Sequence, residues 1–178
     1  MGKIVKQRPP YECLVAYQLG LAIQELTEQF TKRWIKSFRR RSQMDEAARS
    51  NPQNVAEGHT QESLKGYIKL AGIACGSNEE LQNDYRNFLL KNDHKIWPIN
   101  HEKVREFRGF RVKWISQNTL NTPSLPKHPE EAANMLLTFC RMEGVLLRKL
   151  VDSLKEKHKT EGGLTENLYK RRKNYRGY

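Results

Sequence analysis

The sequence lacks long apolar runs and clustered cysteines. No segment of the 178 residues approaches the roughly 18 uninterrupted apolar residues that a membrane-spanning helix requires. Residues 2–10 contain no apolar core of the kind that signal peptides have, so we expect a cytoplasmic protein without a membrane segment. The cysteines Cys13, Cys75 and Cys140 lie far apart, with no C-x-x-C spacing or nearby pair of histidines. They predict buried, reduced thiols and argue against a disulfide framework or a metal site.

Motifs of common enzyme active sites are also absent. The chain has no G-x-G-x-x-G or G-x-x-x-x-G-K-[ST] phosphate loop, no H-E-x-x-H metal motif and no G-x-S-x-G nucleophile turn. No glutamate has a histidine three positions later, as a di-iron helical bundle requires. We therefore expect no catalytic residues, no metal and no cofactor. A metal-dependent nuclease that uses Asp45, Glu46 or Glu57 is a weaker alternative.

Acidic residues are scarce in three stretches that supply most of the formal net charge of +12, at residues 32–41, at residues 101–115 and after residue 167. A solvated surface usually mixes both signs, so cations concentrated in this way attract a polyanion. We therefore predict RNA or DNA as the partner. The predicted contacts are Lys32, Arg33, Lys36, Arg39, Arg40, Arg41, Lys103, Arg105, Arg108, Arg111, Lys113, Lys170, Arg171, Arg172, Lys173 and Arg176.

Aromatic residues accompany these cations. Trp34 and Phe38 interleave with the first stretch, and Tyr169 and Tyr175 with the last. Base stacking on aromatic rings, combined with phosphate contacts, is the physical basis of sequence-tolerant single-strand binding, so both tyrosines join the predicted contacts. Three alternatives remain open. The first stretch could be a solvated helix terminus, the tail could only raise solubility, and the cations could dock an acidic protein partner.

Apolar residues with helical spacing predict an all-α fold. Ala16, Leu19, Ile23, Leu26 and Phe30, for example, draw one apolar stripe. We expect long helices at residues 11–37, 43–57, 61–91 and 129–157, with Pro52 kinking or breaking the second. They predict an antiparallel four-helix bundle over residues 1–157, a small helical insertion at 92–128 that contains a short helix at 101–115, and a basic tail at 158–178.

Two features favour a homo-oligomer. The third predicted helix has a small-residue centre at residues 71–77, which permits a close approach either within the monomer or between subunits. The apolar surface of the fourth predicted helix is wider than one packed stripe needs. An exposed apolar strip of this kind is an association site, and closed cyclic symmetry covers every copy of it.

Three segments resemble one known protein family. AARSNPQNVAEG at residues 47–58 and YIKLAGIACGSNEEL at residues 67–81 are similar to segments of a bacterial four-helix-bundle family. That family includes proteins encoded in intervening sequences of large ribosomal RNA genes and the accessory variability determinants of diversity-generating retroelements. GGLTENLYKRRKNYR at residues 162–176 resembles the suffix of a subset of these bundles.

The resemblance implies a fold, an assembly and partners. Its members form antiparallel bundles that assemble into barrel-like homopentamers with a basic surface. The implied partners are RNA or DNA and, in retroelements, a reverse transcriptase. The resemblance implies no catalytic residues.

Overall fold

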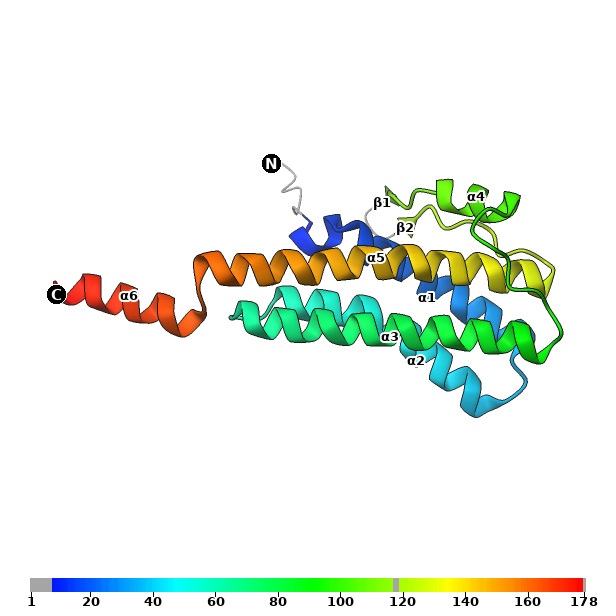
Figure 1. The fold of residues 1–178 in the computed structure, drawn as a ribbon, viewed down its shortest axis with the longest axis horizontal. Helices are drawn as coiled ribbons and strands as arrows, with labels where there is room; N and C mark the ends of the chain where they lie inside the picture. Colours follow the sequence, from blue (N-terminus) through cyan, green and yellow to red (C-terminus); the bar gives the residue numbers. More distant parts are fainter. Residues whose placement is uncertain (1–7, 117–118, 178) are drawn as a thin grey trace, which may run out of the picture.

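The computed structural model describes residues 8–116 and 119–177, which are predominantly helical (Figure 1). This confirms the predicted all-α class. In chain order, the elements are the 3-10 helix η1 Pro10–Cys13, the helices α1 Val15–Trp34, α2 Phe38–His59, α3 Leu64–Lys91 and α4 Glu102–Gly109, the strands β1 Trp114–Ser116 and β2 Thr119–Leu120, and the helices α5 Pro129–Glu161 and α6 Leu164–Arg176. No helix among these described residues is long and apolar enough to cross a membrane.

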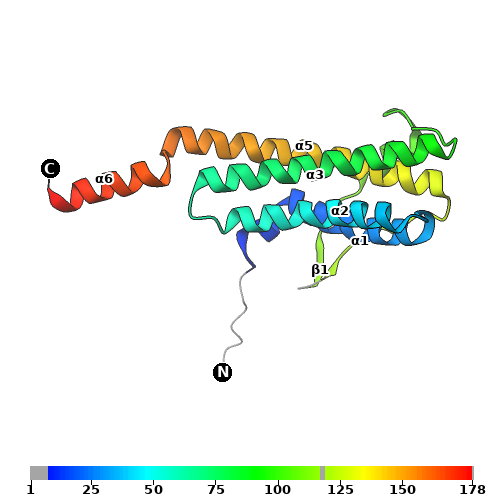
Figure 2. The same cartoon turned by 90° about the horizontal axis from the view of Figure 1, so that it is seen from below.

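Four long helices pack side by side, and the buried apolar residues form two clusters. Helix α1 packs against α2, α2 against α3, α3 against α5, and α5 again against α1. Figure 2 shows α3 and α5 in one layer and α1 and α2 in the other. The side chains of residues 132–140 of α5 are all buried, so this part of the predicted apolar helix is central. Beyond it, Val145 is 46% exposed.

The predicted helix ends need correction. The chain is extended at Leu14 and again at Ile35, so the predicted helix at residues 11–37 is a 3-10 turn followed by α1. Helix α2 starts five residues earlier than predicted, at Phe38, and continues through Pro52 without a break. Ser37 caps α2 by accepting a hydrogen bond from the backbone N–H of Arg40 at 3.4 Å.

A buried polar layer joins three of the long helices, and the fourth packs against it through a glycine. The side-chain amides of Asn51 in α2 and Asn78 in α3 donate to Oε2 of Glu143 in α5, at 2.7 and 2.8 Å. Gly20 in α1 completes this layer, because a Cβ at this position would lie 2.5 Å from Oε1 of Glu143 and 3.3 Å from Cβ of Pro52. Burial raises the pKa of Glu143 to about 8. Glu143 is therefore mostly a neutral carboxylic acid at pH 7.

The centre of α3 is open on one side. Ala71 and Ala74 are buried, but a Cβ added at Gly72 or at Gly76 would have no neighbour within 4 Å. Ile73 between them is 43% exposed. Among the described residues, the two glycines therefore do not mark a close helix crossing within one chain, which was one of the two alternatives for the small-residue centre.

The insertion between α3 and α5 contains a hairpin that the sequence analysis did not predict. The predicted helix at residues 101–115 ends as α4 at Gly109, and β1 then pairs with β2 in an antiparallel sheet. Asn121 supports this turn of the chain, since its amide donates to the carbonyl of Arg111 and its Oδ1 accepts from the backbone N–H of Lys113. Helix α4 packs on α5.

The tail forms helix α6, which extends past the end of the long helices (Figure 1). Helix α5 runs to Glu161, four residues beyond its predicted end, and Gly162 ends it with φ 78°. A positive φ favours glycine there. Helix α6 has no buried residue.

The cysteine prediction holds for only part of the set. Cys140 is buried and Cys75 is half-buried, and burial raises the pKa of both thiols. Cys13 is exposed, contrary to the prediction. It lies in the short 3-10 helix η1, which has no buried residue because it lies before the packed stripe of α1 begins.

Candidate nucleic-acid interface

The first basic group lies at the connection between α1 and α2. Lys32 and Arg33 are in the last turn of α1, as predicted, where cations oppose the negative end of the helix dipole. Arg39, Arg40 and Arg41, in contrast, lie in the first turn of α2, which contains no acidic residue. Cations at a helix N-terminus face the positive end of the dipole, so their placement costs stability unless an anion is bound.

Arg41 has a structural role in this group. Its side chain is half-buried, and Nη2 donates to the carbonyl of Ile35 at 3.1 Å, which closes the α1–α2 connection. Nearby, Oγ1 of Thr31 donates to Asp45 at 2.7 Å. Burial raises the pKa of Asp45, and the positive charge of Arg41 opposes part of that rise. Arg39 and Arg40 are exposed and therefore more available to a ligand.

Phe38 provides an aromatic surface beside these arginines. Its side chain is 82% exposed. It is the first residue of α2, and the next three residues are all arginines. Trp34 is half-buried and packs on Phe30, with ring centroids 5.0 Å apart, while the Arg33 guanidinium carbon lies 5.8 Å from the Trp34 ring. The sequence pattern placed Phe38 among these cations but not among the predicted contacts, and its exposure in the folded chain makes it a candidate contact.

The second basic group lies on α4 and in the segment that follows it. Arg105 and Arg108 are exposed on α4, whereas Arg111 and Lys113 follow the end of the helix. Lys103 forms an ion pair with Glu131 of α5 and is therefore partly neutralised, which makes it a weaker contact than predicted.

The third basic group lies on α6. All five of its predicted cations are exposed, and the side chains of Tyr169 and Tyr175 are 67% and 92% exposed. A helix of 13 residues without tertiary packing is marginally stable in water. Its exposed rings and cations are therefore available to a partner, and binding would stabilise the helix.

The three groups do not form one continuous patch on a single chain. Helix α6 projects from one end of the long helices, whereas the α1–α2 connection lies at the opposite end and α4 lies over α5 (Figure 1). Within the described residues, the ion pairs involve His94, Lys103, Lys157 and Lys159, and no arginine is among them. In the part of the chain that the structure describes, the arginines of all three groups therefore form no direct ion pair with a carboxylate.

A further set of cations was missed in the sequence. Arg141 and Arg148 lie seven residues apart on α5, and Arg86 of α3 is close enough for its charge to act on Arg141. Burial, followed by this like charge, lowers the pKa of Arg141. Arg86 and Arg141 have no basic residue next to them, and Arg148 adjoins only Lys149, so a search for long basic stretches overlooks all three. For Arg141 and Arg148, the spacing of seven residues was the one sequence signal that could have placed them on the same face of a helix.

The three carboxylates of the nuclease alternative, Asp45, Glu46 and Glu57, are not grouped as metal ligands in the part of the chain that the structure describes. Within residues 8–116 and 119–177, there is no group of three or more His, Cys, Asp or Glu side chains that could hold a metal ion. Instead, Glu46 accepts a hydrogen bond from Ser42 at 2.9 Å, and Glu57 accepts one from Gln53 at 2.8 Å. Both are side-chain pairs along the exposed surface of α2.

Comparison with protein-family models gives one match. Residues 14–94, which contain α1, α2 and α3, match the family described as 23S rRNA-intervening sequence protein. This part of the chain, slightly less than half of its length, is therefore similar to that family. The match confirms the resemblance drawn from residues 47–58 and 67–81, both of which lie inside the matched segment. The suffix-like residues 162–176 lie outside it. No curated protein matches the chain.

The residues that resemble this intervening-sequence family serve mainly to pack its helices. Asn51 reaches the buried Glu143, and the hydroxyls of Ser50 and Ser77 share a hydrogen bond of 3.0 Å between α2 and α3. A Cβ at Gly58 would lie 2.4 Å from the ring of Tyr67. The family segment thus specifies how the helices meet, while the exposed cations around it form the candidate interface.

Proposed function

We propose that this chain is a non-catalytic nucleic-acid-binding protein whose arginines neutralise backbone phosphates. The observation that carries the proposal is the surface of arginines without ion pairs, together with Phe38, Tyr169 and Tyr175 exposed beside them. Phosphate neutralisation with base stacking provides affinity with little sequence preference. The name of the matched family refers to ribosomal RNA and so favours RNA over DNA.

We further infer an antiparallel four-helix bundle that assembles into a homo-oligomer. The cyclic contacts among α1, α2, α3 and α5 support the bundle. Its proposed extent is residues 1–157, with residues 92–128 as an insertion and residues 158–178 as a basic tail. Gly72 and Gly76, open on the surface of α3, support a contact between copies. A pentamer is favoured by the family resemblance alone, and a reverse transcriptase is the protein partner that the same resemblance implies.

Removing two cations from the α1–α2 connection tests the proposal. The double variant R39A/R40A should bind a fluorescein-labelled single-stranded 20-mer RNA at least about tenfold more weakly, because each lost phosphate contact reduces counterion release. The matched control is K157A/K159A, which removes the same formal charge from lysines that pair with Glu161 and Glu156. The control should bind within about twofold of the wild type.

Fluorescence anisotropy measures both affinities. Equal weakening by the two variants would show that binding follows net charge alone and would refute the α1–α2 connection as a contact. Absence of RNA and DNA binding at low salt would refute the function. It would favour the alternative in which the cations dock an acidic protein partner, and the purified protein would then carry no nucleic-acid absorbance at 260 nm.

A further inference from the structure

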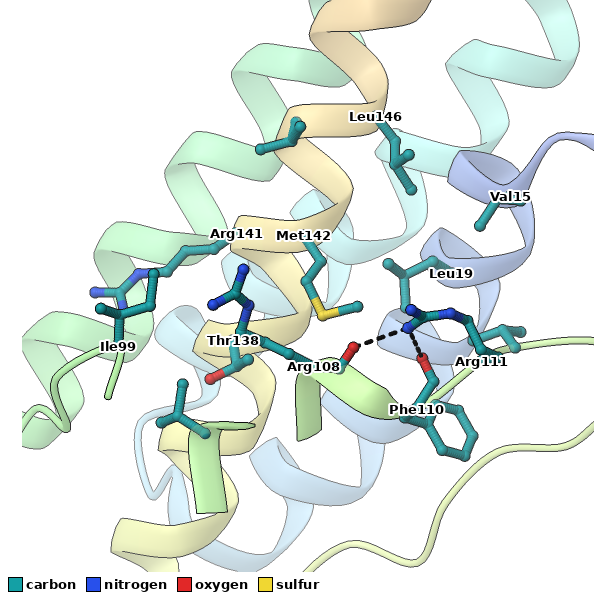
Figure 3. Close-up of a pocket in the computed structure, with 13 residues that line it drawn as sticks. Val15, Leu19, Ile99, Arg108, Phe110, Arg111, Thr138, Arg141, Met142 and Leu146 are labelled. Carbon is teal, nitrogen blue, oxygen red and sulfur yellow. Dashed lines mark hydrogen bonds between the residues drawn. The ribbon is translucent and has the colours of Figure 1, made fainter. Parts of the chain in front are cut away.

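A groove of about 550 Å³ lies between α5, the start of α1 and the segment around α4 (Figure 3). Its floor is apolar, with Met142 and Leu146 from α5 and Leu19 from α1. Two further lining residues, Val145 of α5 and Ile99 before α4, are 46% and 66% exposed. The groove is therefore an apolar surface that the described residues leave partly uncovered.

Three arginines also line this apolar groove. They are Arg108 of α4, Arg111 just after it and Arg141 of α5, and no carboxylate is among the lining residues. Figure 3 shows the guanidinium of Arg111 held by two backbone carbonyls, and its Nη1 donates to those of Arg108 and Phe110 at 2.8 and 3.1 Å. The groove thus presents fixed positive charge around an apolar floor.

The length of the groove along α5 corresponds to a short stretch of helix. Its lining residues on α5 run from Thr138 to Leu146, eight residues along the axis and therefore about 12 Å, or roughly two helical turns. A ligand that fills it needs apolar side chains on one face and carboxylates beside them. Amphipathic helices bind grooves in this way, through anchors spaced three and four residues apart.

Other occupants fit less well. Nucleic acid gains little from a floor of valine, leucine and methionine, and Phe110 is the only aromatic ring among the described residues that line the groove. Helix α6 of a second copy carries Lys170, Arg171 and Arg172, which the arginines of the groove would repel. We propose that this groove binds an acidic amphipathic helix of a partner protein.

The test uses a fluorescein-labelled, helix-stapled 14-residue peptide with leucines at three- and four-residue spacing and glutamates beside them. It should bind the full chain, and a peptide with lysines in place of the glutamates should not. Val145→Gln places a polar group in the groove without changing the charge and should weaken peptide binding at least about tenfold. Leu90→Gln is the matched control, because Leu90 is 63% exposed on α3 and is neither in the groove lining nor beside Gly72 and Gly76. It should leave the affinity unchanged.

Two further measurements separate this inference from the proposed function. Binding of the 20-mer RNA should be the same for Val145→Gln and the wild type, and so should the mass from light scattering. Weaker RNA binding by this variant would assign the groove to nucleic acid, and a smaller assembly would assign it to a contact between copies. Either result overturns the proposal, as does equal binding of the acidic and basic peptides or no binding of either. A melting temperature within about 2 °C of the wild type confirms that each variant is folded.

Discussion

Glu143 gives this protein an unusual pH dependence of stability. Its carboxyl is fully buried, and Oε2 accepts both asparagine amides, whereas Oε1 has no hydrogen-bond partner among the described residues. Burial is the main cause that raises its pKa from 4.5 to about 8, and the two amide hydrogen bonds oppose that rise. The folded chain therefore keeps a proton on Glu143 over a pH range in which the unfolded chain has lost it.

The direction of the effect follows from this difference in bound protons. Below pH 4.5, Glu143 is protonated in both states, and its stabilising contribution is fully present. Between pH 4.5 and about 8, the free energy of unfolding falls by about 1.4 kcal/mol per pH unit, because the folded state binds more protons. The total loss is on the order of 5 kcal/mol, and it levels off above pH 8.

The Glu143→Gln variant tests this reasoning. Its neutral amide has the shape of the protonated acid, and its oxygen can accept from Asn51 and Asn78 as Oε2 of Glu143 does. We expect the variant and the wild type to have similar stability at pH 4.5. At pH 8, the variant should be more stable by several kcal/mol. The assay is urea unfolding followed by circular dichroism at 222 nm, at pH steps between these limits.

The difference between the two proteins isolates Glu143 from the other titrating groups. Burial also raises the pKa of Asp45 and Asp84, but their contributions are common to both proteins and cancel. A Glu143→Ala variant should be less stable at every pH, because it leaves two buried amides without an acceptor. A difference between Gln and wild type that does not change with pH, or a Gln variant less stable at pH 8, would refute the reasoning.

Three further predictions concern packing and binding. Gly20→Ala should lower the free energy of unfolding by about 1–3 kcal/mol, because its Cβ meets the Glu143 carboxyl group and Pro52; urea unfolding measures this change. Deletion of residues 162–178 should leave the thermal melt unchanged, since α6 buries nothing, and should reduce the salt slope of RNA binding by up to about 3.5. Phe38→Ala should reduce the binding free energy for single-stranded RNA, measured by fluorescence anisotropy, by about 1–3 kcal/mol, and the exposed position of Phe38 means that the free energy of unfolding should not change.

The long helices were predictable because their signal is local. An apolar stripe such as Leu19, Ile23, Leu26 and Phe30 fixes one helix face without knowledge of its neighbours. The hairpin also had a local signal that was overlooked. Apolar and basic residues alternate at positions 110–114, a strand pattern that follows Gly109. Treating residues 101–115 as one basic helix concealed this change of period.

The polar layer and the details of the candidate interface were not predictable. Asn51, Asn78 and Glu143 lie far apart in sequence, and although Asn78 falls on the apolar face of its helix, nothing local indicates that it pairs with Glu143. Likewise, nothing local distinguishes Lys103, which pairs with Glu131, from the unpaired arginines of the same stretch. Such roles depend on which helix faces meet, and that is decided only when the chain has packed.

The salt dependence of RNA binding by the wild-type chain tests the central claim most directly. If unpaired cations at the three basic groups neutralise phosphates, the logarithm of the association constant should fall linearly with the logarithm of salt concentration. The slope should be about −3 or steeper, which corresponds to at least about four neutralised phosphates on a single strand. A slope near zero, or no binding of single-stranded RNA at about 50 mM salt, would contradict the account.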